Sequence, residues 1–307
     1  MYKVFIDGRE GTTGLRIFER FAQRDDIEVI SISEELRKDP QERLKKINNS
    51  DVTFLCLPDA ASKEIAVIAE NSSAIIIDAS TAFRCDDNWA YGFPELGADY
   101  LTRLKNMNRI AVPGCHASGS IAVIAPLVVQ KLVAADYPFT LTSLTGYSGG
   151  GKKMIAEYTA EHAREVDAPR IYGLGQAHKH LPEIKKHCHL AVAPVFLPIV
   201  APYYAGMLVT VGLVNKTGKS LEQLHAAYVD FYHNQEFIKV MPLGSEGKML
   251  GSNTLEGKDY MRIYLCGNNE RVTVHAQFDN LGKGASGAAI ECMNIALGLD
   301  AKKGLDF

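Results

Sequence analysis

The sequence lacks the long apolar runs that mark membrane proteins and the leader that marks secreted ones. No apolar run among its 307 residues approaches the roughly 20 residues of a membrane-spanning helix. Residues 2–6 already have the apolar character of a strand, with no charged region, apolar core and cleavage site before them. We therefore expect a soluble, cytoplasmic protein without a membrane partner.

Cysteine pairing and a one-sided charge are also absent. The six cysteines show no C-x-x-C spacing, and several stand inside apolar runs, so we expect reduced thiols that are mostly buried. The formal net charge is -3 and the isoelectric point is near 6.3, with lysine and arginine scattered along the chain. Nucleic acid is therefore not expected as a partner, because its binding needs a concentrated basic surface.

What the chain does have is an alternation of strand and helix patterns in its first third. Residues 2–6, 27–32, 51–57, 74–78 and 110–112 are predicted as strands, and residues 15–21, 39–48 and 60–70 as helices. This order predicts an α/β domain with a parallel, doubly wound sheet, in which ligands collect at the carboxyl ends of the strands.

From about residue 145 the pattern becomes rich in strands, which predicts a second α+β domain with a mixed sheet. The expected strands cover residues 141–144, 191–199, 206–214, 262–266 and 271–278. With 47% hydrophobic residues, the chain can bury two cores. We place the first domain at residues 1–115, completed by a C-terminal helix in residues 285–307, and the second at residues 116–284.

A glycine-rich turn follows the first predicted strand. Gly8, Gly11 and Gly14 suit a tight turn, a close approach of the backbone to phosphate and close helix packing, which favours a dinucleotide site over an ordinary βα turn. At the end of the second strand stand Ser31 and Ser33, where NAD-binding sites carry an acidic residue. This favours NADP, with Ser31, Ser33, Arg37 or Lys38 as phosphate contacts, although Glu34 and Glu35 follow at once.

Cys115 stands between a Pro-Gly turn and a helical run of small residues. A cysteine at the start of a helix is held in the thiolate form, which is the nucleophilic one. The alternative is a small buried hydrophobe, the commonest fate of a free cysteine. The exposed turn before Cys115 favours the nucleophile.

His178, His180 and Glu183 supply two imidazoles and a carboxylate within six positions. Such groups can serve a thiolate as bases. Two alternatives remain: a solvated histidine-rich loop, and a metal site that also uses His187 and His189. The metal reading is disfavoured because paired cysteines and an H-E-x-x-H motif are both absent.

Two further segments carry groups suited to anions. Arg84 follows the fourth predicted strand and can clamp a carboxylate or phosphate, or can be an ordinary surface arginine. Residues 146–152, which include Ser148 and Gly149, form a glycine-rich loop without the spacing of a P-loop.

Taken together, six motifs in order resemble the N-acetyl-gamma-glutamyl-phosphate reductase family, in its shorter form, a relative of aspartate-semialdehyde dehydrogenase. They are G-x-x-G-x-x-G at 8–14, STAFR at 80–84, YGFPEL at 91–96, PGC at 113–115, HKHLPE at 178–183 and DNLGKGASG at 279–287. The resemblance spans nearly the whole chain. It has two departures: the first turn reads Gly-Arg-Glu-Gly-Thr-Thr-Gly where many relatives have small residues, and Cys115 is followed by His116-Ala117-Ser118 where an aromatic residue and threonine are common.

The resemblance implies an NADP-binding Rossmann domain and a domain for substrate binding and oligomerisation, in a homodimer or homotetramer. The implied activity is the NADPH-dependent reduction of N-acetyl-gamma-glutamyl phosphate to N-acetylglutamate 5-semialdehyde, with release of phosphate, in arginine biosynthesis. Cys115 is implied as the nucleophile that forms a thioester, with His178, His180 and Glu183 around it. The implied cofactor contacts are Gly8, Gly11, Thr12, Thr13, Gly14, Ser31, Ser33, Ser148, Gly149 and Asn280, and the implied substrate contacts are Arg84, Ser80 and Glu95.

Three alternatives stay open from the sequence. Aspartate-semialdehyde dehydrogenase uses the same thioester chemistry on a shorter substrate. A non-catalytic NADP-binding regulator has the same two domains but an unreactive Cys115. A lysine-pathway reductase that acts on a carrier-protein-linked substrate is disfavoured, since it needs a basic surface. Which of His178 and His180 moves the proton, and what His116 does, are also left open.

Overall fold

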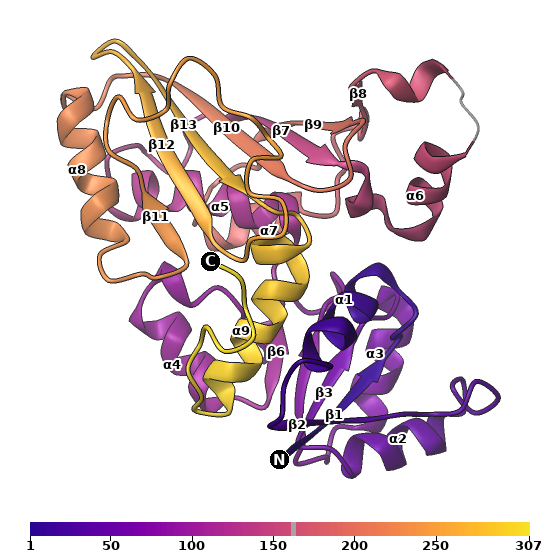
Figure 1. Ribbon diagram of the computed structural model, residues 1–307. Helices are drawn as coiled ribbons and strands as arrows, with labels where there is room; N and C mark the ends of the chain where they lie inside the picture. The colour runs from indigo at the N-terminus through magenta and orange to yellow at the C-terminus, as the bar shows by residue number, and fades with distance from the viewer. Residues whose placement is uncertain (161–163) are drawn as a thin grey trace. The chain divides into compact units, whose positions relative to one another are not determined.

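A computed structural model describes residues 1–160 and 164–307 of the chain (Figure 1). The chain divides into two compact units. The first consists of Met1–Gly114 together with Ala285–Asp306, and the second of Cys115–Gly284 together with Phe307.

The first unit is built on a six-stranded sheet in which every strand pair is parallel. Its strands are β1 (Tyr2–Asp7), β2 (Ile27–Ile30), β3 (Val52–Leu55), β4 (Ile75–Asp78), β5 (Ala90–Tyr91) and β6 (Arg109–Ala111). Their order in the sheet is β2-β1-β3-β4-β6-β5. The predicted doubly wound sheet is confirmed, because the order runs outward in both directions from the β1–β3 pair.

Helices cover both faces of this sheet. Its apolar residues fall into two clusters: one includes Ile17 and Phe21 of α1 (Thr12–Phe21), and the other includes Ile47 of α2 (Pro40–Asn48). Successive residues of β1 alternate between the two clusters, as the two-residue period of a strand requires. The first cluster also takes in α4 (Ala98–Asn106) and α9 (Gly287–Ala296), and the second takes in α3 (Asp59–Ile68).

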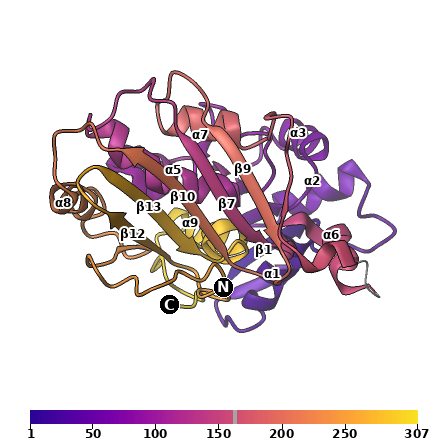
Figure 2. The same cartoon turned by 90° about the horizontal axis from the view of Figure 1, so that it is seen from above.

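The second unit is built on a mixed seven-stranded sheet, as predicted. Its strands are β7 (Thr140–Gly146), β8 (Arg170–Ile171), β9 (Val195–Ala201), β10 (Met207–Val214), β11 (Ile238–Val240), β12 (Met261–Gly267) and β13 (Arg271–Phe278). They lie in the order β11-β12-β13-β10-β7-β9-β8, with β11–β12 and β7–β9 parallel and the other pairs antiparallel. Figure 2 shows the middle five strands, β12-β13-β10-β7-β9, side by side. The strand predicted from residue 191 begins only at Val195.

The buried helix α5 (Cys115–Val129) packs against this sheet. At Gly119 the helix comes so close to β10 and β13 that an added Cβ would lie 2.5 Å from Val209 Cγ2. Pro126 has no N–H to donate to the Ala122 carbonyl within the helix. The Tyr232 hydroxyl of the segment after α8 (Leu221–Phe231) donates to that carbonyl instead, at 2.8 Å, and so fixes α5 in place.

The remaining elements of the second unit are short. They are α6 (Gly151–Thr159), α7 (Leu181–His187), two 3-10 turns at Tyr147–Gly150 and Arg164–Asp167, and a π-turn at Gly282–Ser286. Within the described residues, no helix is long and apolar enough to cross a membrane.

Candidate active site

Cys115 is the first residue of α5, so its side chain stands at the positive end of the helix dipole. Cys115 and Cys56 are both partly exposed, whereas Cys188 and Cys292 are buried. Burial raises the pKa of the Cys56 thiol, which the nearby carboxyl groups of Asp78 and Asp7 raise further, and burial also raises the pKa of Cys188. Position therefore separates Cys115 from the inert cysteines, as nucleophilic chemistry needs a thiolate that can be reached.

The backbone around Cys115 is closely packed on its own unit. An added Cβ at Gly284 would lie 3.0 Å from the Cys115 Cβ and 3.1 Å from the Asp279 carbonyl oxygen. Gly284 ends the glycine-rich segment of the DNLGKGASG motif that belongs to this unit. Glycine at 284 thus lets this segment lie directly against the candidate nucleophile.

The residue after Cys115 lies at the centre of a cluster of rings. The His116 ring has its centroid 5.6 Å from the His178 and His180 rings, 6.0 Å from Tyr172 and 5.3 Å from Phe196. His178 and His180 are themselves 4.8 Å apart. The structure therefore brings together both predicted imidazoles, from the segment before α7, with the helix that begins at Cys115.

Burial controls the charge of these imidazoles. It lowers the pKa of His178 below its usual value, and the charge of Lys179 lowers it further. His180 is 4% exposed and Glu183, in the first turn of α7, is 1% exposed. The solvated-loop alternative does not fit His180, which the structure buries, whereas His178 is half-buried and Lys179 is exposed. Within the described ranges 1–160 and 164–307, no group of three or more histidine, cysteine and acidic residues has the arrangement of a metal site.

Two predicted cofactor contacts are joined in the second unit. The Asn280 amide nitrogen donates to Ser148 Oγ at 2.9 Å, and the Asn280 amide oxygen accepts from the Gly206 backbone N–H at 2.8 Å. Both side chains are about 1% exposed. Gly149 lies beside them, with its Cβ position 3.4 Å from Asn280 Nδ2. The glycine-rich loop at residues 146–152 is therefore held in place at Ser148.

Two positions in the glycine turn of the first unit accept only glycine. Gly8 has φ +85°, and an added Cβ there would lie 2.3 Å from the Cys56 carbonyl oxygen; at Gly14 it would lie 2.6 Å from the Gly8 carbonyl oxygen. Gly11 precedes α1 and supplies no side-chain cap. The Thr12 hydroxyl is buried without a hydrogen-bond partner among the described residues. Helix N–H groups and a buried hydroxyl are groups that bind phosphate. The predicted cofactor contact of Thr13 stays a prediction.

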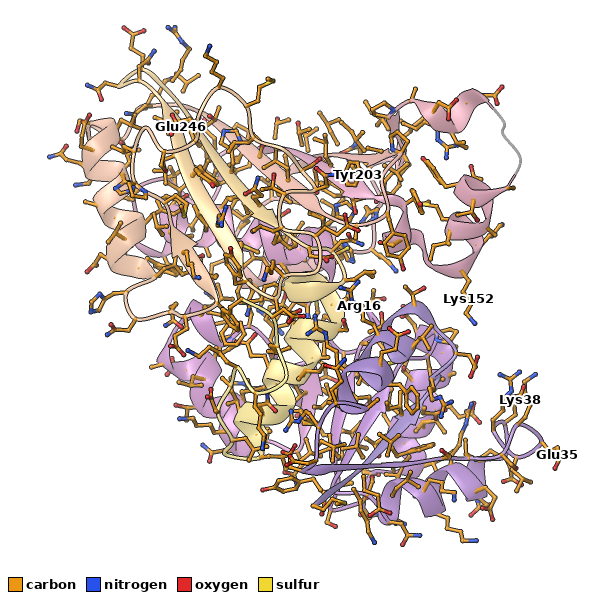
Figure 3. The ribbon with its side chains drawn as sticks, in the orientation of Figure 1. Arg16, Glu35, Lys38, Lys152, Tyr203 and Glu246 are labelled. Atoms are coloured by element: carbon orange, nitrogen blue, oxygen red, sulfur yellow. The ribbon has the colours of Figure 1, made fainter. Side chains whose placement is uncertain are left out.

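A pocket of about 300 Å³ opens beside this turn. Its lining comes from the ends of β1 and β2, the loop after β2, α2 and the residue after β3, and comprises Ile6, Asp7, Gly8, Arg9, Glu10, Ile30, Ser31, Ile32, Glu34, Arg37, Lys38, Arg43 and Leu57. Ser31, Arg37 and Lys38 were predicted here, and Lys38 stands near the tip of the loop with Glu35 (Figure 3). Ser33 is absent from the lining of this pocket in the described part of the chain.

The sequence did not predict the contacts that hold the side chains of this pocket in place. Arg43 Nε donates to the Arg37 carbonyl at 2.6 Å and lies 3.4 Å from Asp7 Oδ2. The Arg9 guanidinium stacks over the Phe18 ring at 3.9 Å. Burial raises the pKa of Asp7 from 3.8 to about 6, against the opposing effects of Arg43 and the Gly8 N–H. Asp7 and Arg43 are 36 positions apart, so only the fold reveals their pairing.

The three predicted substrate contacts all lie in the first unit and are buried. Arg84 donates from Nε to the Val112 carbonyl at 2.8 Å and from Nη2 to the Ala79 carbonyl at 3.0 Å, which excludes the surface-arginine alternative. Ser80 Oγ donates to Asp78 Oδ2 at 2.6 Å. Glu95 lies in the 3-10 turn Pro94–Leu96. Their contact with substrate stays a prediction.

Sequence reasoning also missed Ser143 and Tyr172 around His116. The His116 Nδ1 atom lies 2.6 Å from Ser143 Oγ of β7, and Nε2 lies 2.6 Å from the Tyr172 hydroxyl just after β8. Both partners stand in segments without a catalytic motif, and neither spacing nor periodicity singles them out.

Comparison with protein families places both units in one superfamily. Residues 3–103 match the model described as "Semialdehyde dehydrogenase, NAD binding domain", and residues 115–280 match "Semialdehyde dehydrogenase, dimerisation domain". Among solved structures, aspartate semialdehyde dehydrogenase II from Vibrio cholerae superposes with a TM-score of 0.75 at 17% identity, covering 97% of this chain and 99% of that one. At that identity the likeness shows the fold alone.

Curated relatives are much closer in sequence. N-acetyl-gamma-glutamyl-phosphate reductase 2 of Nostoc sp. is 39% identical over 318 residues, covering 99% of each chain. The N-acetyl-gamma-glutamyl-phosphate reductases of Sinorhizobium fredii and Rhizobium meliloti are each 42% identical, and each alignment covers 96% of this chain and 98% of the relative.

Proposed function

Because the chain belongs to the N-acetyl-gamma-glutamyl-phosphate reductase family of the semialdehyde dehydrogenase superfamily, we propose that it reduces N-acetyl-gamma-glutamyl phosphate to N-acetylglutamate 5-semialdehyde. One observation carries the proposal: close relatives named for this activity match nearly the full length. The accessible cysteine at the start of α5, beside buried imidazoles, suits the same chemistry. The reaction makes this protein an oxidoreductase of arginine biosynthesis.

The first unit fits NADP. The start of α1, with Gly11 and the buried Thr12 hydroxyl, suits the diphosphate. The cations that line the pocket after β2 suit the 2′-phosphate, because no carboxylate stands at the end of β2 to hold the ribose hydroxyl of NAD. Ser31, Lys38 and Arg43 are the residues that would hold this phosphate. Ser148 and Asn280 are proposed to contact the nicotinamide end.

Cys115 is the proposed nucleophile. Its thiolate attacks the acyl carbon of the substrate, the carbon–oxygen bond to phosphate breaks, and inorganic phosphate leaves with the electron pair, so that a thioester remains on the sulfur. NADPH, when bound, supplies the hydride that this carbon needs to reach the aldehyde level. N–H groups at the start of α5 stabilise the oxygen as it gains negative charge.

The imidazoles of His178 and His180 manage protons at Cys115. The lowered pKa of His178 keeps it neutral near pH 7, so it can accept the thiol proton before attack. The same proton returns to the sulfur or oxygen as the aldehyde leaves. Glu183 orients this pair, while Arg84, Ser80 and Glu95 bind the acyl phosphate or the substrate carboxylate.

The assembly and location follow the same reasoning. The second unit matches a model described as a dimerisation domain, and we propose a homodimer or homotetramer. A biosynthetic enzyme with small-molecule substrates, and with no membrane-spanning helix in its described residues, is proposed to work in the cytoplasm.

The reverse reaction tests the proposal. The purified protein is mixed with N-acetylglutamate 5-semialdehyde, phosphate and NADP, and absorbance of the reduced cofactor is followed, with phosphate omitted, NAD in place of NADP, and aspartate semialdehyde as control arms. Phosphate-dependent reduction of NADP is the expected result. Activity with aspartate semialdehyde alone reassigns the substrate, and silence with both aldehydes favours the non-catalytic regulator.

A further inference from the structure

Both ring nitrogens of His116 and the ring itself contact other side chains, yet the mechanism above gives this imidazole no role. Both ring nitrogens lie 2.6 Å from hydroxyl oxygens, Nδ1 from Ser143 and Nε2 from Tyr172. Its ring also packs against His178 and His180. Partners thus reach His116 from β7, from the segment after β8 and from the segment that leads into α7.

His116 stays neutral throughout the pH range in which such an enzyme works. Burial, with smaller effects of His178 and Lys179, lowers its pKa from 6.5 to about 3. A neutral imidazole has one N–H and one lone pair, so it donates to one hydroxyl and accepts from the other. With both nitrogens used and 3% of the residue exposed, His116 has no atom left to exchange protons with a substrate.

The Tyr172 hydroxyl, which bonds to His116, lies near enough to Cys115 to be affected by its charge. Burial, and next the negative charge of Cys115, raise the pKa of Tyr172, so the phenol remains protonated. The groups that face His116 are the ionisable Cys115, Tyr172, His178 and His180, the nearby ammonium of Lys179, and the neutral Ser143. The orientation of Tyr172 is set through His116 by Ser143, a residue of the rigid sheet.

We propose that His116 is a positioning residue for Cys115: anchored on Ser143, it fixes the Tyr172 hydroxyl and the His178 and His180 rings beside the thiolate. This inference rests on the proposed function for its role in turnover, although the reactivity of the thiol reports on it without any substrate. It also gives a task to the imidazole that stands where many relatives carry an aromatic residue.

Three substitutions at one position separate the two hydrogen bonds. H116F keeps an aromatic ring and loses both bonds. An Asn amide nitrogen reaches the place of Nδ1 and a Gln amide nitrogen that of Nε2, so H116N keeps the Ser143 side and H116Q the Tyr172 side. S143A removes the anchor without adding bulk, in case H116F folds poorly.

His275 provides the matched control. It lies on β13, in the sheet that also holds Ser143, and its two ring nitrogens are also bonded to hydroxyls, Thr210 Oγ1 at 2.8 Å and Thr273 Oγ1 at 2.9 Å. H275F therefore removes the same number of hydrogen bonds from an imidazole outside the ring cluster. A purely structural effect would appear in both variants.

Two readouts are needed. The first is the rate at which iodoacetamide alkylates Cys115 at pH 7, read on its peptide by mass spectrometry because Cys85 is also exposed. The second is kcat for the reductase reaction, with KM for NADPH measured alongside. We expect H116F to lower both the alkylation rate and kcat at least about tenfold with KM unchanged, H116Q to recover part of each loss, and H275F to change neither.

Unchanged alkylation and kcat in H116F and S143A, with a loss of thermal stability equal to that of H275F, would overturn the proposal and leave His116 a packing residue. If the wild-type protein has no reductase activity, the proposed function fails, and the alkylation series alone decides whether His116 positions Cys115.

Discussion

The pocket beside the glycine turn and the ring cluster beside Cys115 both lie at the start of a helix. They differ in charge: the pocket is lined by many charged side chains, and the cluster consists mainly of rings and hydroxyls. The pocket is lined by four cations, Arg9, Arg37, Lys38 and Arg43, and by three acidic residues, the buried Asp7 and the exposed Glu10 and Glu34. The cluster around His116 contains rings and hydroxyls, and burial lowers the pKa of His116 and of His178. Fixed positive charge suits the binding of a phosphate anion, whereas neutral bases suit the generation of a thiolate.

The largest effect should come from replacing Cys115, which lies beside the ring cluster. We expect C115S to lower the rate of reduction at least about a thousandfold, because a serine hydroxyl is a far weaker nucleophile near pH 7. NADPH affinity, measured by fluorescence titration, should stay within about twofold of wild type because the first unit is unchanged. Loss of NADPH binding together with activity would show that the substitution damages the fold.

The second effect concerns the buried carboxylate of the charged pocket. The pKa of Asp7 rises on folding from 3.8 to about 6, so the stability that protonated Asp7 contributes is present below pH 4 and is lost as the pH rises through 6. D7N should therefore raise the free energy of unfolding by about 2 kcal/mol at pH 8, and by almost nothing at pH 4.

Urea unfolding can follow this change through Trp89, the only tryptophan of the sequence, which is buried in the first unit. Because Asp7 also pairs with Arg43, D7N should weaken NADP binding while it stabilises the fold. Equal stabilisation at both pH values would refute the assigned pKa.

The third effect tests whether the charged pocket binds the 2′-phosphate of NADP. K38A removes a cation from the pocket lining and should weaken NADP binding about tenfold while leaving NAD binding almost unchanged, as a charged hydrogen bond is worth roughly 1.5 kcal/mol or more. K63A, which removes an exposed lysine of α3 that does not line this pocket, is the control. An equal loss for both cofactors would place the nucleotide differently.

The smallest effect is a displacement of the pH profile. His178 must be neutral to accept a proton, and because its pKa lies below the usual 6.5, more than half of it is neutral at pH 6.5. The kcat/KM for the reaction should therefore keep at least about half of its pH 7 value at pH 6.5, with the acid limb at lower pH. A half-maximal point above pH 7 would mean that the imidazole is not desolvated as the structure has it.

Regular periodicity made most of the fold predictable. The strands β1, β3, β10 and β13 begin and end within about two residues of their predicted bounds, because buried strands read as continuous or alternating apolar runs. The two-residue β5 and β8 were missed, since a run so short has no period.

The site was predictable only where a residue lies in a motif. Cys115, His178 and His180 stand in local patterns, and the fold brings the two histidines together next to the Cys115 helix. Ser143, Tyr172 and the Asp7–Arg43 pair carry no local signal, because what joins them is strand pairing and helix packing between distant positions. Likewise the sequence at Arg84 fits a surface arginine as well as a ligand contact, and only the fold shows that its side chain donates to two backbone carbonyls.

The central claim, a thioester on Cys115, is tested most directly by trapping it. The protein is mixed with N-acetylglutamate 5-semialdehyde and NADP without phosphate, quenched rapidly in acid, and digested for peptide mass spectrometry. The account predicts an N-acetylglutamyl adduct on the peptide that contains Cys115, which disappears when phosphate is added before the quench. Turnover without any adduct on Cys115, or an adduct confined to the exposed Cys85, would contradict it.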